Sequence, residues 1–240
     1  MNSSIRKLLL IIFLLILNLS YSQIKNGKIH YRVSIDVERN IKEIEAMSIS
    51  PGVKARLLDS YRNAKPVQLV LTFQTDLAFN EGEIDLNNLK TSNTMLVQSG
   101  AKKQTYTTQN PHSILTTGGL MGAVLTEENL PVWELVDETK QIGDYSCYKA
   151  RGYILGEGNS GQVKKEFEAW YTPDIPVQFG PYVYSGLPGL VLQVNFDDDL
   201  LFEATEIILN LPDLKEIQLP DLKIISRQEA NQKLKGYLRN

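Results

Sequence analysis

The chain has 240 residues, of which 42% are hydrophobic and 22% charged, a length and composition that allow a sizeable core. Its 25 basic and 28 acidic residues give a net charge of −3, and no cluster of Lys and Arg occurs. A nucleic-acid partner is therefore not expected, because phosphate neutralisation needs clustered cations. The single cysteine, Cys147, excludes an internal disulfide, so stability must come from packing and strand pairing.

The first 22 residues have the layout of a secretory signal peptide. Two basic residues precede the uninterrupted apolar run 8–17, and small residues on either side of Tyr21 come just before Gln23. Ten helical residues rise only about 15 Å, about half of a bilayer core, so a membrane anchor is not expected. We expect cleavage after residue 22 and no lipid anchor, because no cysteine lies at the cleavage site. We also expect a periplasmic or secreted protein whose residues 23–240 form a single β-rich domain.

Alternating polar and apolar residues predict two strands in the first third of the chain, at 28–38 and 67–79, each with one buried face. A helix is predicted between them over 50–64, with Ser50 as its cap and Pro51 as its first residue. Its apolar stripe consists of Val53, Leu57, Tyr61 and Ala64. Short turns between the later strands favour antiparallel pairing throughout.

The pattern is weaker in the next segment, where we expect short strands at 94–98 and 103–108. The glycine-rich stretch 118–125 lacks the Lys-Ser/Thr ending of a phosphate-binding loop and is interpreted as a connection. Strands follow at 132–136, 145–155 and 165–171, with a hairpin loop at 156–161, and a further hairpin joins 190–196 to 200–209.

The sequence "LPDLK" occurs twice, at 211–215 and 219–223. A proline in each copy argues against a central strand and favours an extended segment on the surface or at a sheet edge. Ser226 and Glu229 form a capping box that predicts a final helix over 226–238. The predicted fold is mainly β or α+β, an antiparallel and strongly curved sheet or half-barrel with two helices, at about 50–64 and 226–238.

Residue types that carry chemistry are present but not in diagnostic patterns. His30 and His112 have no metal-ligand spacing, and no serine lies in a nucleophile elbow. Cys147 is interpreted as a small buried hydrophobe, with a reactive thiol as the alternative. The aspartates 197–199 are interpreted as a polar hairpin tip and not as a calcium loop. Glu166 and Glu168 share one strand face, which is commoner for solvated side chains than for an acid–base pair, so we assign no catalytic, metal or cofactor residues.

The most informative window is 170–190, "WYTPDIPVQFGPYVYSGLPGL", with four prolines, five aromatic residues and one charge. Prolines stiffen this connection, and aromatic residues bring a large apolar area. Within it, residues 187–190 match a type II turn, in which Gly189 would supply the positive φ, while Gly186 would permit a close backbone approach. The predicted structural turn comprises Gly186, Leu187, Pro188, Gly189 and Leu190, and a strand begins after it.

This segment, "SGLPGLVLQV", resembles the signature of the GLPGLI family of small exported bacterial proteins, with Val191 in place of isoleucine. The resemblance extends to "WELVDETKQIGDYSCYKA" and "EAWYTPDIPVQFGP" and covers about residues 130–206. It implies an exported protein associated with the cell envelope. The biochemical function of the family is largely undefined, so the resemblance implies no catalytic residues and no cofactor.

Three functions remain open at this point. The first is a non-catalytic binding or accessory module that contacts an envelope protein or an apolar ligand. Its candidate binding surface is Trp170, Tyr171, Phe179, Tyr182 and Tyr184, and the alternative is that these aromatic residues cap one end of the core. The second is an extracytoplasmic hydrolase. The third is a structural or assembly protein of an envelope complex, which the two LPDLK segments motivate because an extended edge can add to a neighbour's sheet.

Overall fold

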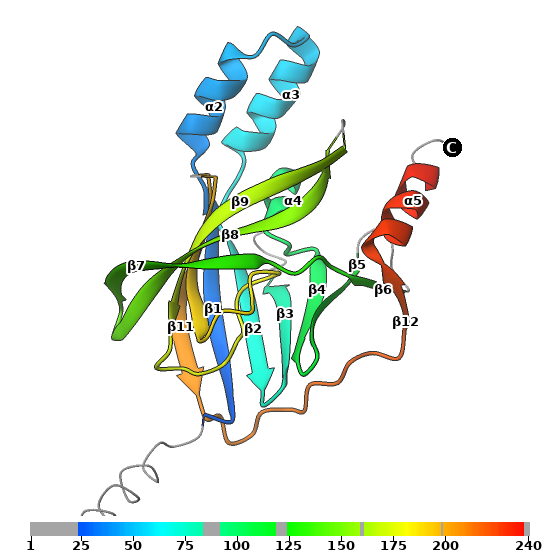
Figure 1. Ribbon diagram of the computed structural model, residues 1–240. Coiled ribbons are helices and arrows are strands. Elements are labelled where there is room, and N and C mark those ends of the chain that lie inside the picture. The colour runs from blue at the N-terminus through cyan, green and yellow to red at the C-terminus, as the bar shows by residue number, and fades with distance from the viewer. Residues whose placement is uncertain (1–23, 84–91, 119–123, 159–160, 198, 238–240) are drawn as a thin grey trace, which may run out of the picture.

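The computed structural model describes residues 24–83, 92–118, 124–158, 161–197 and 199–237. Twelve strands among these residues form one sheet, in the order β12-β6-β5-β4-β3-β2-β1-β11-β10-β9-β8-β7. All neighbours are antiparallel except β12 and β6. The sheet is strongly curled and stays open between β12 and β7 (Figure 1). The predicted antiparallel, strongly curved fold is confirmed.

The strand bounds follow the alternating sequence pattern closely in the second half of the chain. The strands are β1 (Asn26–Ile35), β2 (Val67–Gln74), β3 (Leu77–Glu83), β4 (Lys103–Gln109), β5 (His112–Gly118), β6 (Val124–Glu127), β7 (Val132–Ile142), β8 (Tyr145–Gly158), β9 (Gly161–Thr172), β10 (Leu190–Phe196), β11 (Leu200–Leu209) and β12 (Lys223–Ser226). The predicted signal peptide lies outside the described residues, as does part of the loop 156–161.

Both predicted helices are present, as α3 (Pro51–Arg62) and α5 (Arg227–Tyr237), and the Ser226 hydroxyl accepts the Glu229 N–H at 3.1 Å. Two further helices were not predicted, α2 (Val37–Ala46) and α4 (Asn93–Gln98). The predicted strand 28–38 is too long, because Asp36 caps α2 by accepting the Arg39 N–H at 3.0 Å. The predicted strand 94–98 is wrong: this segment is α4, and the side chain of Ser92 caps it.

Helices α2 and α3 form a hairpin that stands out from one end of the sheet (Figure 1). Helix α2 buries Asn40 and Ile44, but α3 buries no residue, so its apolar stripe contributes only partly buried contacts with α2 and α4. None of the described helices is long and apolar enough to cross a membrane.

The LPDLK copies lie in an extended, mostly exposed run between β11 and β12, and the second copy ends where β12 begins. The run is attached to β2 through Gln74, whose side chain donates to the Lys215 carbonyl at 3.0 Å and accepts the Ile217 N–H at 2.9 Å. This agrees with the predicted extended segment on the surface.

The long connection from β9 to β10 packs inside the curl of the sheet. Its apolar side chains Ile175, Val177, Phe179 and Leu187 are at most 6% exposed and belong to the main hydrophobic core. The Phe179 ring lies 5.7 Å from that of Phe73 on β2. The connection therefore contributes part of the hydrophobic core inside the curled sheet.

Candidate functional site

Two side chains from the sheet hold the backbone of the β9–β10 connection and of the start of β10. Asn80 on β3 donates to the Gly180 carbonyl and accepts the Tyr182 N–H, both at 3.3 Å. The Tyr31 hydroxyl on β1 donates to the Val191 carbonyl at 2.6 Å. Because Tyr31 is fully buried, its pKa is raised well above the usual value, and the group stays a neutral donor.

Ser185 is the third anchor of the connection. Its carbonyl accepts the Trp133 indole N–H at 2.9 Å, and its hydroxyl lies 3.1 Å from His112 Nε2. Burial lowers the pKa of His112, which favours the neutral imidazole. Ser185 is 0% exposed, and no described carboxylate hydrogen-bonds to the His112 ring. The pair therefore fixes the loop against β5 and does not present a nucleophile to solvent.

The predicted turn is present as a bend before β10, but its type II geometry is wrong. The positive φ, +99°, belongs to Gly186 and not to Gly189, and Leu190 N–H bonds to the Ile175 carbonyl. At both glycines a neighbouring group leaves no room for a Cβ atom. A Cβ on Gly189 would lie 2.2 Å from the Thr172 carbonyl oxygen, and one on Gly186 would lie 2.7 Å from the His112 ring.

The structure brings together only two of the five candidate surface residues. Phe179 and Tyr171 are 0% and 6% exposed and pack in the core. Trp170 lies on the opposite face of β9 from Tyr171, with Lys140 Nζ 4.3 Å from its ring centroid. Tyr182 and Tyr184 lie together on a cleft, Tyr182 half-buried and Tyr184 6% exposed.

This cleft has a volume of about 370 Å³ and opens between the β9–β10 connection, β9 and the β10–β11 turn. Apolar and aromatic side chains form most of it: Val97, Ile154, Phe167, Tyr182, Val183, Tyr184, Phe196 and Leu200. The Phe167 ring packs edge-on against Tyr184 at 4.9 Å, so the floor is rigid. Phe167 was not predicted as a site residue, although the alternation in β9 places it on the inner face. We call this the inner cleft.

A buried carboxylate network forms one end of the inner cleft. The Glu128 side chain is 7% exposed and accepts hydrogen bonds from Thr116 Oγ1 at 2.6 Å and Arg227 Nη1 at 3.0 Å, with Lys103 Nζ at 3.5 Å. Arg227 is the first residue of α5, so this network also attaches the C-terminal helix. The Glu128 carboxylate is thus neutralised by two cations of the protein and is not available to a ligand.

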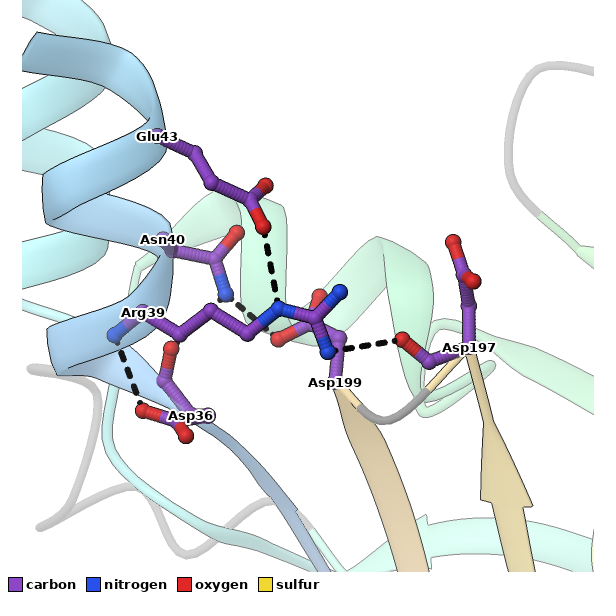
Figure 2. Close-up of polar contacts among 6 residues, drawn as sticks. All are labelled: Asp36, Arg39, Asn40, Glu43, Asp197 and Asp199. Carbon is purple, nitrogen blue, oxygen red and sulfur yellow. Dashed lines mark hydrogen bonds and ion pairs between the residues drawn. The ribbon is translucent and has the colours of Figure 1, made fainter. Parts of the chain in front are cut away.

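The other end of the inner cleft is formed by Asp199, in the polar contacts between α2 and the β10–β11 turn (Figure 2). The Asn40 amide donates to the Asp199 carboxylate, and Arg39 Nη1 donates to the Asp197 carbonyl at 3.1 Å. Arg39 also pairs with Glu43 at 2.9 Å. Burial raises the pKa of Asp199. These aspartates hold α2, consistent with a hairpin tip.

A second hollow, of about 700 Å³, lies across β7 to β10. Its polar and aromatic side chains include Glu134, Arg151, Tyr153, Glu166, Glu168 and Asp197. Glu166 and Glu168, which were predicted to share a strand face, both line this hollow. Glu168 pairs with Lys149 at 3.1 Å and with Arg151 at 3.5 Å. We call it the outer trough.

The remaining residues with reactive side chains are separate from both hollows. His30 lies 3.9 Å from Glu83 and 3.7 Å from Glu206 on the sheet surface. Cys147 is fully buried, and burial raises the pKa of its thiol to about 11, so it behaves as the small hydrophobe that was predicted. Within the described residues, no group of three or more His, Cys, Asp or Glu side chains is arranged to hold a metal ion.

Comparison with known proteins gives a family for one segment and a fold for most of the chain. Residues 155–193 match a family described as a protein of unknown function (Porph_ging). No curated protein matches the chain. The structures of PNGF-II in the C2 and P21 space groups are similar to it at 16% and 14% identity, with TM-scores of 0.50 and 0.51.

The PNGF-II matches cover 87% of this chain, but the chain spans only about a third, 32%, of that protein. At this identity the likeness shows the fold alone. The family match covers the end of β8, β9, the β9–β10 connection and the start of β10. It therefore contains the loop that fills the curl and much of the wall of the inner cleft.

Proposed function

We propose that this chain is an exported, non-catalytic binding module of the cell envelope that belongs to the GLPGLI family. The observation that carries the proposal is the inner cleft, an aromatic hollow of about 370 Å³ beside the loop that gives the family its motif. This volume lies in the range of small ligand sites, which are mostly apolar with a few polar groups at their edges. An apolar ligand or an apolar side chain of an envelope protein fits this chemistry.

Binding accounts for the cleft better than hydrolysis does. Among the described residues, the Ser185–His112 pair is the arrangement that most favours the alternative of an extracytoplasmic hydrolase. A nucleophile must reach its substrate, and Ser185 is 0% exposed. The described charged groups at the cleft ends, Glu128 and Asp199, are engaged by Arg227 and Asn40 and hold the fold together.

Export is the second part of the proposal and is tested separately. Expression of the full chain should give a processed protein that begins at Gln23, found in the periplasm or the medium and without a lipid modification. N-terminal sequencing and intact mass of the purified protein measure this. An unprocessed N-terminus in the cytoplasmic fraction would contradict it.

The binding role is tested by a photo-crosslinking amino acid at Val97, which lines the inner cleft and is 59% exposed. The matched control is Leu135 on β7, equally exposed at 59% and outside both hollows. Irradiation in intact cells should give one discrete adduct from position 97, which mass spectrometry identifies, and none from position 135. Equal labelling at both positions, or no adduct from a folded and exported protein, would refute the binding role.

A further inference from the structure

The first half of β9 has one edge without a strand partner. Strand β9 pairs with β8 along its length from Gly161, but its pairing with β10 reaches only Phe167. Residues 161–166 are all exposed, and no hydrogen bond joins their other edge to any described residue. In Figure 1 this part of the β8–β9 ribbon extends beyond the body of the sheet. Such an edge offers backbone N–H and C=O groups that another chain can pair with.

The free edge begins where the two hollows meet. Successive side chains of a strand point to opposite faces. Lys165 lines the inner cleft, Glu166 and Glu168 line the outer trough, and Phe167 lines both. A strand added beside this edge would alternate in the same way, with every second side chain above the inner cleft and the others above the outer trough.

The two hollows differ in the side chains they would accept. The inner cleft presents aromatic side chains from Phe167, Tyr184 and Phe196. The charged residues that line the outer trough are four carboxylates, Glu134, Glu166, Glu168 and Asp197, and one cation, Arg151. Two lysines lie beside it: Lys149 pairs with Glu168 at 3.1 Å, and Lys164 Nζ lies 4.5 Å from the centre of the Tyr153 ring. Neither Glu134 nor Glu166 has an ion-pair partner among the described residues. The trough is therefore complementary to a basic side chain.

We propose that an extended segment of a partner protein, with apolar and basic residues in alternation, binds by adding a strand to the free edge of β9. Backbone hydrogen bonds to residues 161–166 hold the segment, and the two hollows select its side chains, apolar in the inner cleft and basic in the outer trough. This inference rests on the proposed binding function and specifies the partner.

Strand addition is tested with a short fluorescent peptide of alternating leucine and lysine, titrated with residues 23–240 and followed by anisotropy. The peptide should bind, and its counterpart of leucine and glutamate should bind at least about tenfold more weakly, because the trough is acidic. Two further peptides are N-methylated on alternate sets of amides. One should lose binding and the other keep it, since every second amide of an added strand points to the edge. Equal binding of both would overturn strand addition.

The protein side of the interface is tested by Glu166→Lys, with Glu216→Lys as the control, because Glu216 is an exposed carboxylate outside both hollows. We expect the first variant to weaken the leucine–lysine peptide about fivefold, the size of a partly screened charge reversal, and the second to leave it unchanged. Unchanged affinity in both variants would overturn the role of the trough.

The outcomes separate the two proposals. If the leucine–lysine peptide does not bind but the crosslink at Val97 still forms, strand addition is wrong and the binding module stands. If neither is observed, both are wrong. If the protein sediments as a dimer that Glu166→Lys dissociates, the edge pairs with a second copy of this chain and the proposed foreign segment is wrong.

Discussion

Replacement of Tyr184 by alanine tests most directly whether the β9–β10 connection is part of the core. The ring is 6% exposed and packs edge-on against Phe167 at 4.9 Å and Phe202 at 5.3 Å. Truncation of a buried aromatic side chain costs about 3–5 kcal/mol, and each edge-on contact accounts for about 0.5–1.5 kcal/mol of it. We expect Tyr184→Ala to lose about 4 kcal/mol, a large part of the about 5–15 kcal/mol of a typical domain.

Guanidinium unfolding of residues 23–240, followed by the fluorescence of Trp133 and Trp170, measures this loss as a lower midpoint at an unchanged slope. Tyr184→Phe keeps the ring and should remain within about 1 kcal/mol of wild type. Tyr182→Ala should cost about 1 kcal/mol, since its side chain is only partly buried. If Tyr184→Ala were as stable as Tyr184→Phe, the connection would not be core, and the reasoning about the inner cleft would be refuted.

Three further predictions concern the surroundings of the loop. Gly186→Ala should destabilise the protein by about 2 kcal/mol or more, because φ is +99° and the new Cβ would meet the His112 ring. Gly52→Ala is the control, because Gly52 lies in open space on α3 and its replacement should be neutral or stabilising. Thermal unfolding of the two variants measures the difference. Burial lowers the pKa of His112, so the unfolded chain binds this proton more readily, and stability should decrease as the pH falls below about 6.5. His112→Gln should make that decrease shallower in unfolding titrations between pH 7 and 5, and an identical slope would contradict the assignment. Cys147, with its pKa raised to about 11, should not react with Ellman's reagent at pH 8 until the protein is unfolded, and immediate reaction of the native protein would be the contrary result.

The sequence predicted the sheet well where local patterns decide the structure. Alternation of apolar and polar residues located β8 to β11, although β10 begins with three buried residues, and the Ser226 capping box located α5. The alternation placed the end of the first strand too late, because the alternating pattern continues by coincidence through Val37, the first residue of α2. The cap at Asp36 was the available signal for that helix, as Ser92 was for α4.

The site was less predictable because its geometry depends on contacts between distant residues. The carbonyl of Thr172 leaves no room for a side chain at Gly189, and the ring of His112 leaves none at Gly186. Both neighbours are distant in the sequence, so a local turn pattern does not show either constraint. The inner cleft needs the register of β9 with β10, in which Phe196 pairs with Phe167. Aromatic composition pointed to the correct loop but could not separate the buried Phe179 from Tyr182, whose position depends on Asn80.

The place of β1 in the middle of the sheet affects how the protein can be made. Its partners are β2 on one side and β11 on the other, so the pairing that begins with Asn26 is completed only when Leu209 is present. A chain growing on a ribosome therefore keeps one side of its first strand without a partner until nearly all of it has been synthesised. The complete sheet can therefore form only near the end of synthesis, and until then the edge of β1 that β11 covers is open to pairing with another chain.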